Sequence, residues 1–193
     1  HIKFGEASAV LAGSSLLTLA FEIISDKKYL LNSLVKNEII KTLARCSGHT
    51  GVAGGQELDL KYENKKKNIN QIINMQKKKT GKLFNFCLSA VGEVARKTAL
   101  EKKSLSSLGE EIGLLFQLSD DFLDQKGSKK LAGKPVKKDN KKGKSTLVSL
   151  IGEKKAYSYA YNLKKKILRN LKKHGKKANE LINTIEFILE RKF

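Results

Sequence analysis

The chain has 193 residues, of which 40% are hydrophobic, and its formal net charge is +20. This length is sufficient for one domain with a substantial core. A single proline favours long helices over a turn-rich β protein. No uninterrupted apolar run approaches 18 residues, so we expect no membrane span. The two cysteines, Cys46 and Cys87, lie far apart without metal-ligand spacing, which argues against a disulfide framework and fits a cytoplasmic location.

The positive charge first suggests a nucleic-acid or anionic-lipid partner. Only four of the 39 basic residues are arginines, although arginine is the usual residue for bidentate contacts to phosphate and guanine. The lysines are spread over nearly every polar face of the chain. We therefore interpret most of the surplus as solvated surface and expect no nucleic-acid partner, with a few lysines left for an anionic substrate.

The N-terminal part of the chain shows helical periodicity. Residues 2–25 and 29–46 carry apolar residues at helical spacing, and the Gly-Ser-Ser sequence at 13–15 suggests a break in the first helix. Residues 48–60 are rich in glycine, which weakens a helix by roughly 1 kcal/mol per residue relative to alanine. Glycine also lets another backbone or a ligand come close. Residues 61–68 are expected to form a charged loop.

Helix is expected again from about residue 69, with an interruption at 77–83 and an apolar segment from Leu83 to Val94. Ser107 followed by Glu110 is a capping-box spacing, which predicts the start of the next helix. Gly127 is a suitable end for that helix.

Residues 153–173 and 176–192 predict two final amphipathic helices separated by Gly175. We find neither an internal repeat nor a second domain. The sequence therefore predicts an all-α fold in one helical domain, residues 1–193.

The helix expected to end at Gly127 carries three carboxylates inside an apolar run. Burying an unpaired charge costs several kcal/mol or more, so a partner has to compensate these acids. Asp120 and Asp124 share one helix face, and Gln117, Asp121 and Asp124 form an adjacent row. Three carboxylates over one and a half turns suit Mg²⁺, which keeps most of its waters and bridges to phosphate. The motif alone leaves a solvated acidic turn as the alternative.

Residues 126–146 form a basic run without helical periodicity. Loops of this length inside compact domains are usually functional lids or disordered. The triplet Gly143-Lys144-Ser145 is part of a P-loop pattern, but Lys138 stands where that motif needs glycine, and no strand precedes it. We expect a cationic flap over a diphosphate, the alternative being a solvated loop.

Four further stretches accompany the acidic motif FQLSDDFLD at 116–124. They are HIKFGEA with LLTLAFE before residue 23, GGQELDL at 54–60, KTG at 79–81, and the run from Gly133 to the GKST at 143–146. Together, and in this order, they resemble the trans-prenyltransferases, the polyprenyl diphosphate synthases. The resemblance covers residues 1 to about 152 and is strongest to bacterial short-chain farnesyl or geranyl diphosphate synthases.

This resemblance implies an isoprenoid-synthase-type helical bundle around a central cavity, usually in a homodimer. It also implies a Mg²⁺-dependent transferase of isoprenoid biosynthesis. Such an enzyme condenses an allylic diphosphate with isopentenyl diphosphate, head to tail, into a short-chain prenyl diphosphate of the farnesyl or geranyl type.

Residue roles follow from matching positions in the family's motifs. The acids that would hold Mg²⁺ on the diphosphate are Asp120, Asp121 and Asp124. The lysines that would bind diphosphate oxygens are Lys79, Lys134 and Lys144. Thr80 and Gln117 would line the allylic site near the nascent cation, and with Lys79 and Lys144 they are the expected catalytic residues. Phe116 is expected in the cavity wall, and Gln56 and Asp59 near the cavity.

The chain also departs from the family's pattern. The family's first aspartate-rich motif and the arginines after it would lie upstream of His1, so we expect the C-terminal part of a synthase, with half an active site and no turnover alone. Ser14 stands where many relatives have aspartate, and Lys137 where many have glycine. Two alternatives remain: a non-catalytic regulatory or partner subunit of such a synthase, and a basic nucleic-acid-binding helical protein. The intact acidic motif argues against the first.

Overall fold

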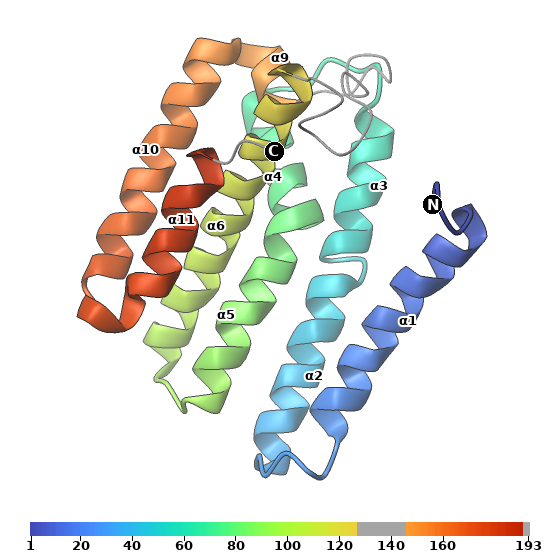
Figure 1. Cartoon of the computed structure of the whole chain (residues 1–193), viewed down its shortest axis with the longest axis vertical. Helices are drawn as coiled ribbons and strands as arrows, with labels where there is room; N and C mark the ends of the chain where they lie inside the picture. The colour runs from blue at the N-terminus through green and yellow to red at the C-terminus, as the bar shows by residue number, and fades with distance from the viewer. Residues whose placement is uncertain (127–145, 191–193) are drawn as a thin grey trace.

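A computed structural model describes residues 1–126 and 146–190, which form a bundle of helices without a strand (Figure 1). The all-α prediction is confirmed. In chain order the α-helices are α1 (Glu6–Ser25), α2 (Ser33–Ser47), α3 (Val52–Tyr62), α4 (Ile69–Gln76), α5 (Lys82–Val94), α6 (Ala99–Lys126), α9 (Leu147–Ile151), α10 (Glu153–Lys172) and α11 (Asn179–Glu190). A π-helical turn, η1 (Lys77–Gly81), joins α4 to α5, and a 3₁₀ turn, η2 (Gly175–Ala178), precedes α11.

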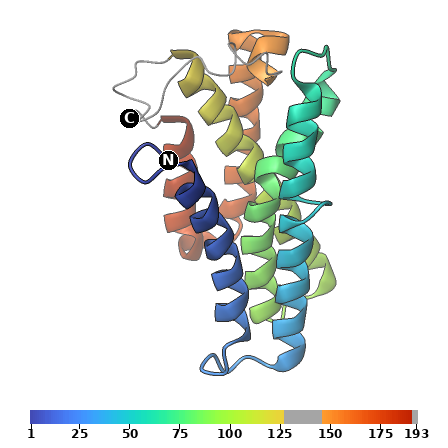
Figure 2. The same ribbon diagram turned by 90° about the vertical axis from the view of Figure 1, so that its right-hand side faces the viewer.

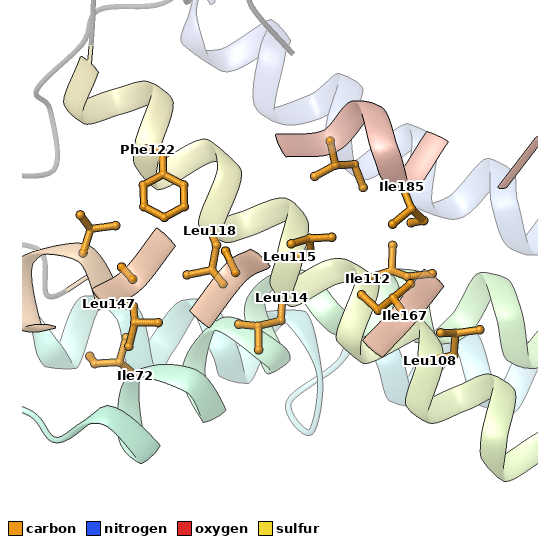
Figure 3. Packing of buried hydrophobic residues seen from close by; sticks show 14 of the residues in the cluster. Ile72, Leu108, Ile112, Leu114, Leu115, Leu118, Phe122, Leu147, Ile167 and Ile185 are labelled. Atoms are coloured by element: carbon orange, nitrogen blue, oxygen red, sulfur yellow. The ribbon is translucent and has the colours of Figure 1, made fainter. Parts of the chain in front are cut away.

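The long helix α6 is the central element of the bundle. It packs against α5 and η1 on one side and against α10 and α11 on the other. Its residues Leu114, Leu115 and Leu118 are almost fully buried, in a core that also takes side chains from α4, α9, α10 and α11 (Figure 3). Burying a leucine side chain contributes roughly 1.5–3 kcal/mol, so the acidic motif at the end of α6 stands on a firmly anchored helix.

The start of α6 differs from the sequence prediction. The helix begins at Ala99, not at Ser107, which lies inside it. Its cap is Thr98: the Thr98 backbone N–H donates to Glu101 Oε2 at 2.9 Å, and the Glu101 N–H donates to Thr98 Oγ1. These hydrogen bonds form a capping box at Thr98–Glu101. The Ser107–Glu110 spacing, although it has the same pattern, does not mark a helix start.

Other boundaries show where the packed chain overrides local sequence. Helix α1 continues through Gly13 without a break, and α3 forms despite its glycines. The short helix α9 was not predicted from the sequence and is capped by Thr146, whose side chain accepts from Ser149 N–H. The interruption expected at 77–83 is confirmed as η1, and π-helical turns are frequent at functional sites.

The glycines of α3 and α6 bring backbones into direct contact, as was expected for those of residues 48–60. A Cβ added to Gly55 would lie 2.2 Å from the backbone nitrogen of Lys79 in η1. A Cβ on Gly113 would lie 2.5 Å from the Cα of Gly81. Helices α3 and α6 therefore press on η1 from two sides and fix where its side chains point.

Helix α1 packs along α2 at the edge of the bundle and has no buried residue (Figure 2). Its exposed large apolar side chains are Val10, Leu11, Leu16, Leu17, Leu19 and Ile23. Among the described helices, α1 is the one whose length and composition would allow it to cross a membrane. Signal sequences and core helices meet the same criteria, so the expectation of no membrane span stays a prediction. Both cysteines are free.

Candidate functional site

The π-helical turn η1 presents Lys79 and Thr80 to two neighbouring helices. Lys79 Nζ lies 2.5 Å from Asp59 Oδ2 of α3, in an ion pair whose aspartate is buried. Asp59 belongs to the GGQELDL stretch, and Gly55 in that stretch is the residue that lets α3 approach. The structure thus brings two of the sequence motifs into contact through one charge pair.

Thr80 connects the same turn to α6. Its hydroxyl donates to Gln117 Oε1 at 2.7 Å, and Gln117 Nε2 donates to Asp121 Oδ1 at 2.9 Å. The two residues expected beside the allylic site therefore lie next to each other, in a hydrogen-bond chain that ends on the acidic motif.

A fourth residue, Gln76 at the end of α4, completes this chain. Its Nε2 donates to Asp121 Oδ2 at 2.9 Å, so each carboxylate oxygen of Asp121 accepts from one amide. Gln76 and Asp121 are 3% and 4% exposed. Gln76 was not among the residues predicted from the sequence; the available signal was an amide one helical turn after Ile72, on the apolar face of α4.

The two other acids of the motif differ in their surroundings. Asp124 is buried and Asp120 is half-exposed at the end of α6. Ser119, immediately before Asp120, donates to the backbone oxygen of Ile188 at 2.6 Å, which fixes this end of α6 to α11. Asp120 and Asp124 share one helix face, whereas Asp121 contacts α4 through the amide of Gln76.

The donor set fits Mg²⁺ in its chemistry, because carboxylate oxygens are ligands that this ion prefers and a bound phosphate supplies further oxygens. Within residues 1–126 and 146–190, no three acidic, histidine or cysteine side chains gather closely enough to hold a metal ion by themselves. The magnesium site at Asp120, Asp121 and Asp124 therefore stays a prediction.

The remaining expected residues are distributed as follows. Lys134 and Lys144 lie outside the described residues, together with Lys137 and Gly127. Gln56 is exposed on α3. Phe116 lines a cavity of about 410 Å³ between α5, α6 and α11, and its ring lies 5.5 Å from that of Phe84.

Comparison with known proteins decides the family. A family model described as polyprenyl synthetase matches residues 1–185. The chain belongs to the polyprenyl synthetase family. This agrees with the resemblance carried by the five sequence motifs.

Individual relatives support the same assignment. The farnesyl diphosphate synthase of Micrococcus luteus is 38% identical over 152 residues, which cover 79% of this chain and 52% of the relative. That of Escherichia coli is 34% identical and covers 99% of this chain and 66% of the relative. The chain thus spans half to two thirds of the length of these relatives.

Solved structures of the family share the fold. A geranyltransferase of Helicobacter pylori, complexed with magnesium and isoprenyl diphosphate, matches with a TM-score of 0.82 at 32% identity. The match covers 98% of this chain and 62% of that one. A farnesyl/geranylfarnesyl diphosphate synthase of Zymomonas mobilis matches with a TM-score of 0.81 at 35% identity. The isoprenoid-synthase-type bundle expected from the sequence is confirmed.

Proposed function

We propose that this chain forms the allylic-diphosphate side of a Mg²⁺-dependent short-chain prenyl diphosphate synthase. The observation that carries the proposal is the hydrogen-bond chain that joins the Lys79–Thr80 turn to Asp121 of the acidic motif. Membership of the polyprenyl synthetase family and relatives named farnesyl diphosphate synthase support it. A regulatory subunit would not need this chain of buried polar contacts.

The reaction is a head-to-tail condensation. The allylic C–O bond breaks, diphosphate leaves with the bonding electrons, the double bond of isopentenyl diphosphate attacks the carbocation, and a proton is lost. The protein has to hold the leaving diphosphate and place electron-rich groups beside the cation.

Lys79 is suited to the diphosphate. Its ammonium group has three donors, of which one meets Asp59 and the others can bind phosphate oxygens. Lys134 and Lys144 would add cationic donors from residues that the structure does not describe. Mg²⁺ held by the acidic motif would stabilise the charge that develops on the leaving group.

Thr80 and Gln117 are suited to the cation. Their oxygens carry lone pairs, and their mutual hydrogen bond at 2.7 Å keeps both side chains in one orientation. Preorganised dipoles of this kind stabilise developing charge without reorganising during the reaction.

The proposal includes a cytoplasmic homodimer. The free cysteines fit a reducing compartment, and the exposed apolar side chains of α1 form the type of surface that marks an interface between proteins. Light scattering coupled to gel filtration measures the mass directly. A monomer at micromolar concentration would contradict the proposed homodimer but would not bear on the proposed reaction.

Product formation tests the proposed activity. The protein, made with all the sequence that its gene encodes, is mixed with Mg²⁺, labelled isopentenyl diphosphate and geranyl diphosphate, and the extracted prenyl product is counted. We expect product from the wild type and a loss of about 10³-fold or more in Asp120→Ala, because metal-assisted charge stabilisation amounts to several kcal/mol.

The matched control is Glu101→Ala, which removes an acid from the N-terminal end of the same helix. This variant should retain wild-type turnover. Full activity in Asp120→Ala would refute the metal assignment, and absence of product from the wild type would refute the activity.

A further inference from the structure

The amide of Gln76 has an unusual environment. It lies at the C-terminal residue of α4, is 3% exposed, and donates through Nε2 to Asp121 Oδ2 at 2.9 Å. The other atom of the same amide, Oε1, is buried and has no hydrogen-bond partner among the residues that the structure describes. A buried acceptor left without a partner costs about 1–3 kcal/mol.

Chemistry determines which way this amide points. An ionised carboxylate only accepts hydrogen bonds, so the NH₂ group of Gln76 has to face Asp121. Turning the amide would place two oxygens against each other. The contact with Asp121 therefore holds Gln76 in the orientation that leaves Oε1 without a partner among the described residues. This indicates that the hydrogen bond to Asp121 is the main role of the Gln76 side chain.

The position of Gln76 gives the contact a consequence for the site. It immediately precedes η1, the turn that carries Lys79 and Thr80. Thr80 reaches Asp121 Oδ1 through Gln117, whereas Gln76 reaches Oδ2 directly. Gln76 and Thr80, at the two ends of residues 76–80, thus connect to the two oxygens of the Asp121 carboxylate, Gln76 directly and Thr80 through Gln117.

We propose that Gln76 is a positioning residue for the synthase. It fixes the orientation of the Asp121 carboxylate and the position of the acidic motif relative to the Lys79–Thr80 turn. The inference rests on the proposed function for its kinetic consequence, but its structural content stands apart from it. Outer hydrogen-bond partners of metal-site carboxylates typically change metal affinity or activity 10–100-fold when they are replaced.

Gln76→Met and Gln76→Glu test the proposal in the protein made with its full encoded sequence. Methionine keeps the length of the side chain and removes the donor, and glutamate replaces the donor by a second negative charge. We expect kcat to fall 10–100-fold in Gln76→Met and further in Gln76→Glu. The affinity for inorganic diphosphate in the presence of Mg²⁺, measured by calorimetry, should fall in the same order.

Ile72→Val is the matched control, since it removes one methylene from a fully buried residue one turn earlier on the same helix. It should lower the melting temperature and leave kcat and the calorimetric affinity unchanged. If Gln76→Met does the same, Gln76 is only a packing residue and the proposal is wrong.

A double-mutant cycle identifies the route of the effect. In an Asp121→Asn background, Gln76→Met should add less than about threefold, because residues that act through one another are not additive. A full 10–100-fold further loss would overturn the proposed route through Asp121.

A crystal structure of the wild type with Mg²⁺ and inorganic diphosphate needs neither turnover nor a variant that folds. We expect the Gln76–Asp121 hydrogen bond to persist and an ordered water to donate to Gln76 Oε1. A structure in which Asp121 has turned away from Gln76 would overturn the inference. A wild type without product would instead refute the proposed function, and the same crystal structure would still decide the role of Gln76.

Discussion

Two partly buried polar clusters join the α4–η1–α5 segment to α6, and they differ in the contacts of their carboxylates: one pairs with a lysine, and the other accepts from two amides. The first, here called the site cluster, consists of Gln76, Thr80, Gln117 and Asp121. The second, called the ion-pair cluster, consists of Lys82, Asn85, Ser106 and Glu110. In the ion-pair cluster, Glu110 Oε1 lies 2.5 Å from Lys82 Nζ and accepts from Asn85 Nδ2 at 3.2 Å.

The difference separates a structural role from a chemical one. The ion-pair cluster contains its own cation, so its charges cancel within the fold. In the site cluster, the amides of Gln76 and Gln117 each donate to one oxygen of Asp121 and so orient its carboxylate. We infer that the ion-pair cluster stabilises the helix pair and that the site cluster orients a carboxylate of the acidic motif.

Neutralising one acid in each cluster should give opposite phenotypes. Asp121→Asn should lower kcat by about 10–100-fold, because the orientation and charge of the acid are lost together. Glu110→Gln should keep kcat within about threefold and lower the free energy of unfolding by about 1 kcal/mol, since this ion pair is partly exposed. Turnover assays and urea unfolding measure both. Equal effects on activity would show that the comparison is wrong.

The glycine contact beneath Lys79 is the next way to disturb the site cluster. Gly55→Ala places a Cβ 2.2 Å from the Lys79 backbone nitrogen, and overpacking of this kind costs about 1–3 kcal/mol. We expect a loss of stability and of turnover, because η1 has to move.

Gly13→Ala is the control for that substitution. Gly13 lies inside α1, and nothing lies within 4 Å of an added Cβ. It should stabilise the protein by about 0.5–1 kcal/mol without changing turnover. A neutral Gly55→Ala variant would mean that α3 does not fix η1.

Asp59 should act on substrate binding through Lys79. Asp59→Asn removes the charge that holds the Lys79 ammonium group, so we expect KM for the allylic diphosphate to rise about tenfold, as one lost charge-assisted contact implies. Glu57→Gln on the same helix is the control, because its pair with Lys61 is exposed and should matter little. An unchanged KM in Asp59→Asn would show that Lys79 is positioned by other contacts.

The smallest effect lies at the start of α6. Hydrogen bonds from the Thr98 backbone, then from Lys97, lower the pKa of Glu101 from 4.5 to about 2. A lowered pKa contributes stability above pH 4.5 that is lost as the pH falls towards 2. The stability difference between wild type and Glu101→Gln should therefore shrink over that window. Urea midpoints at pH 5 and pH 3 measure it, and a constant difference would contradict the cap.

Most of the fold could be predicted from the sequence, because long amphipathic helices show a regular spacing of apolar residues. The prediction was wrong at the start of α6, which the Thr98–Glu101 box caps. At α3 the glycines gave the close approach to Lys79 but left the helix itself unassigned. Packing against η1 compensates for their poor helix propensity.

The candidate site was partly predictable for a different reason. The acids, Lys79, Thr80 and Gln117 belong to motifs that can be recognised in the chain. Gln76 belongs to none of them, because its role exists only when α4 meets a residue 45 positions later. A buried amide on an apolar helix face was the available signal, and only the fold shows what it contacts.

The central claim is that the acidic motif of α6 and the Lys79–Thr80 turn form opposite walls of one diphosphate site. A crystal structure of the protein with Mg²⁺ and a non-ionising thio analogue of the allylic diphosphate tests it most directly. We predict the diphosphate between Lys79 and the acids Asp120 and Asp124, with the metal on the side of the acids. A diphosphate bound elsewhere, with the Lys79–Asp59 pair and the acidic motif untouched, would contradict the account.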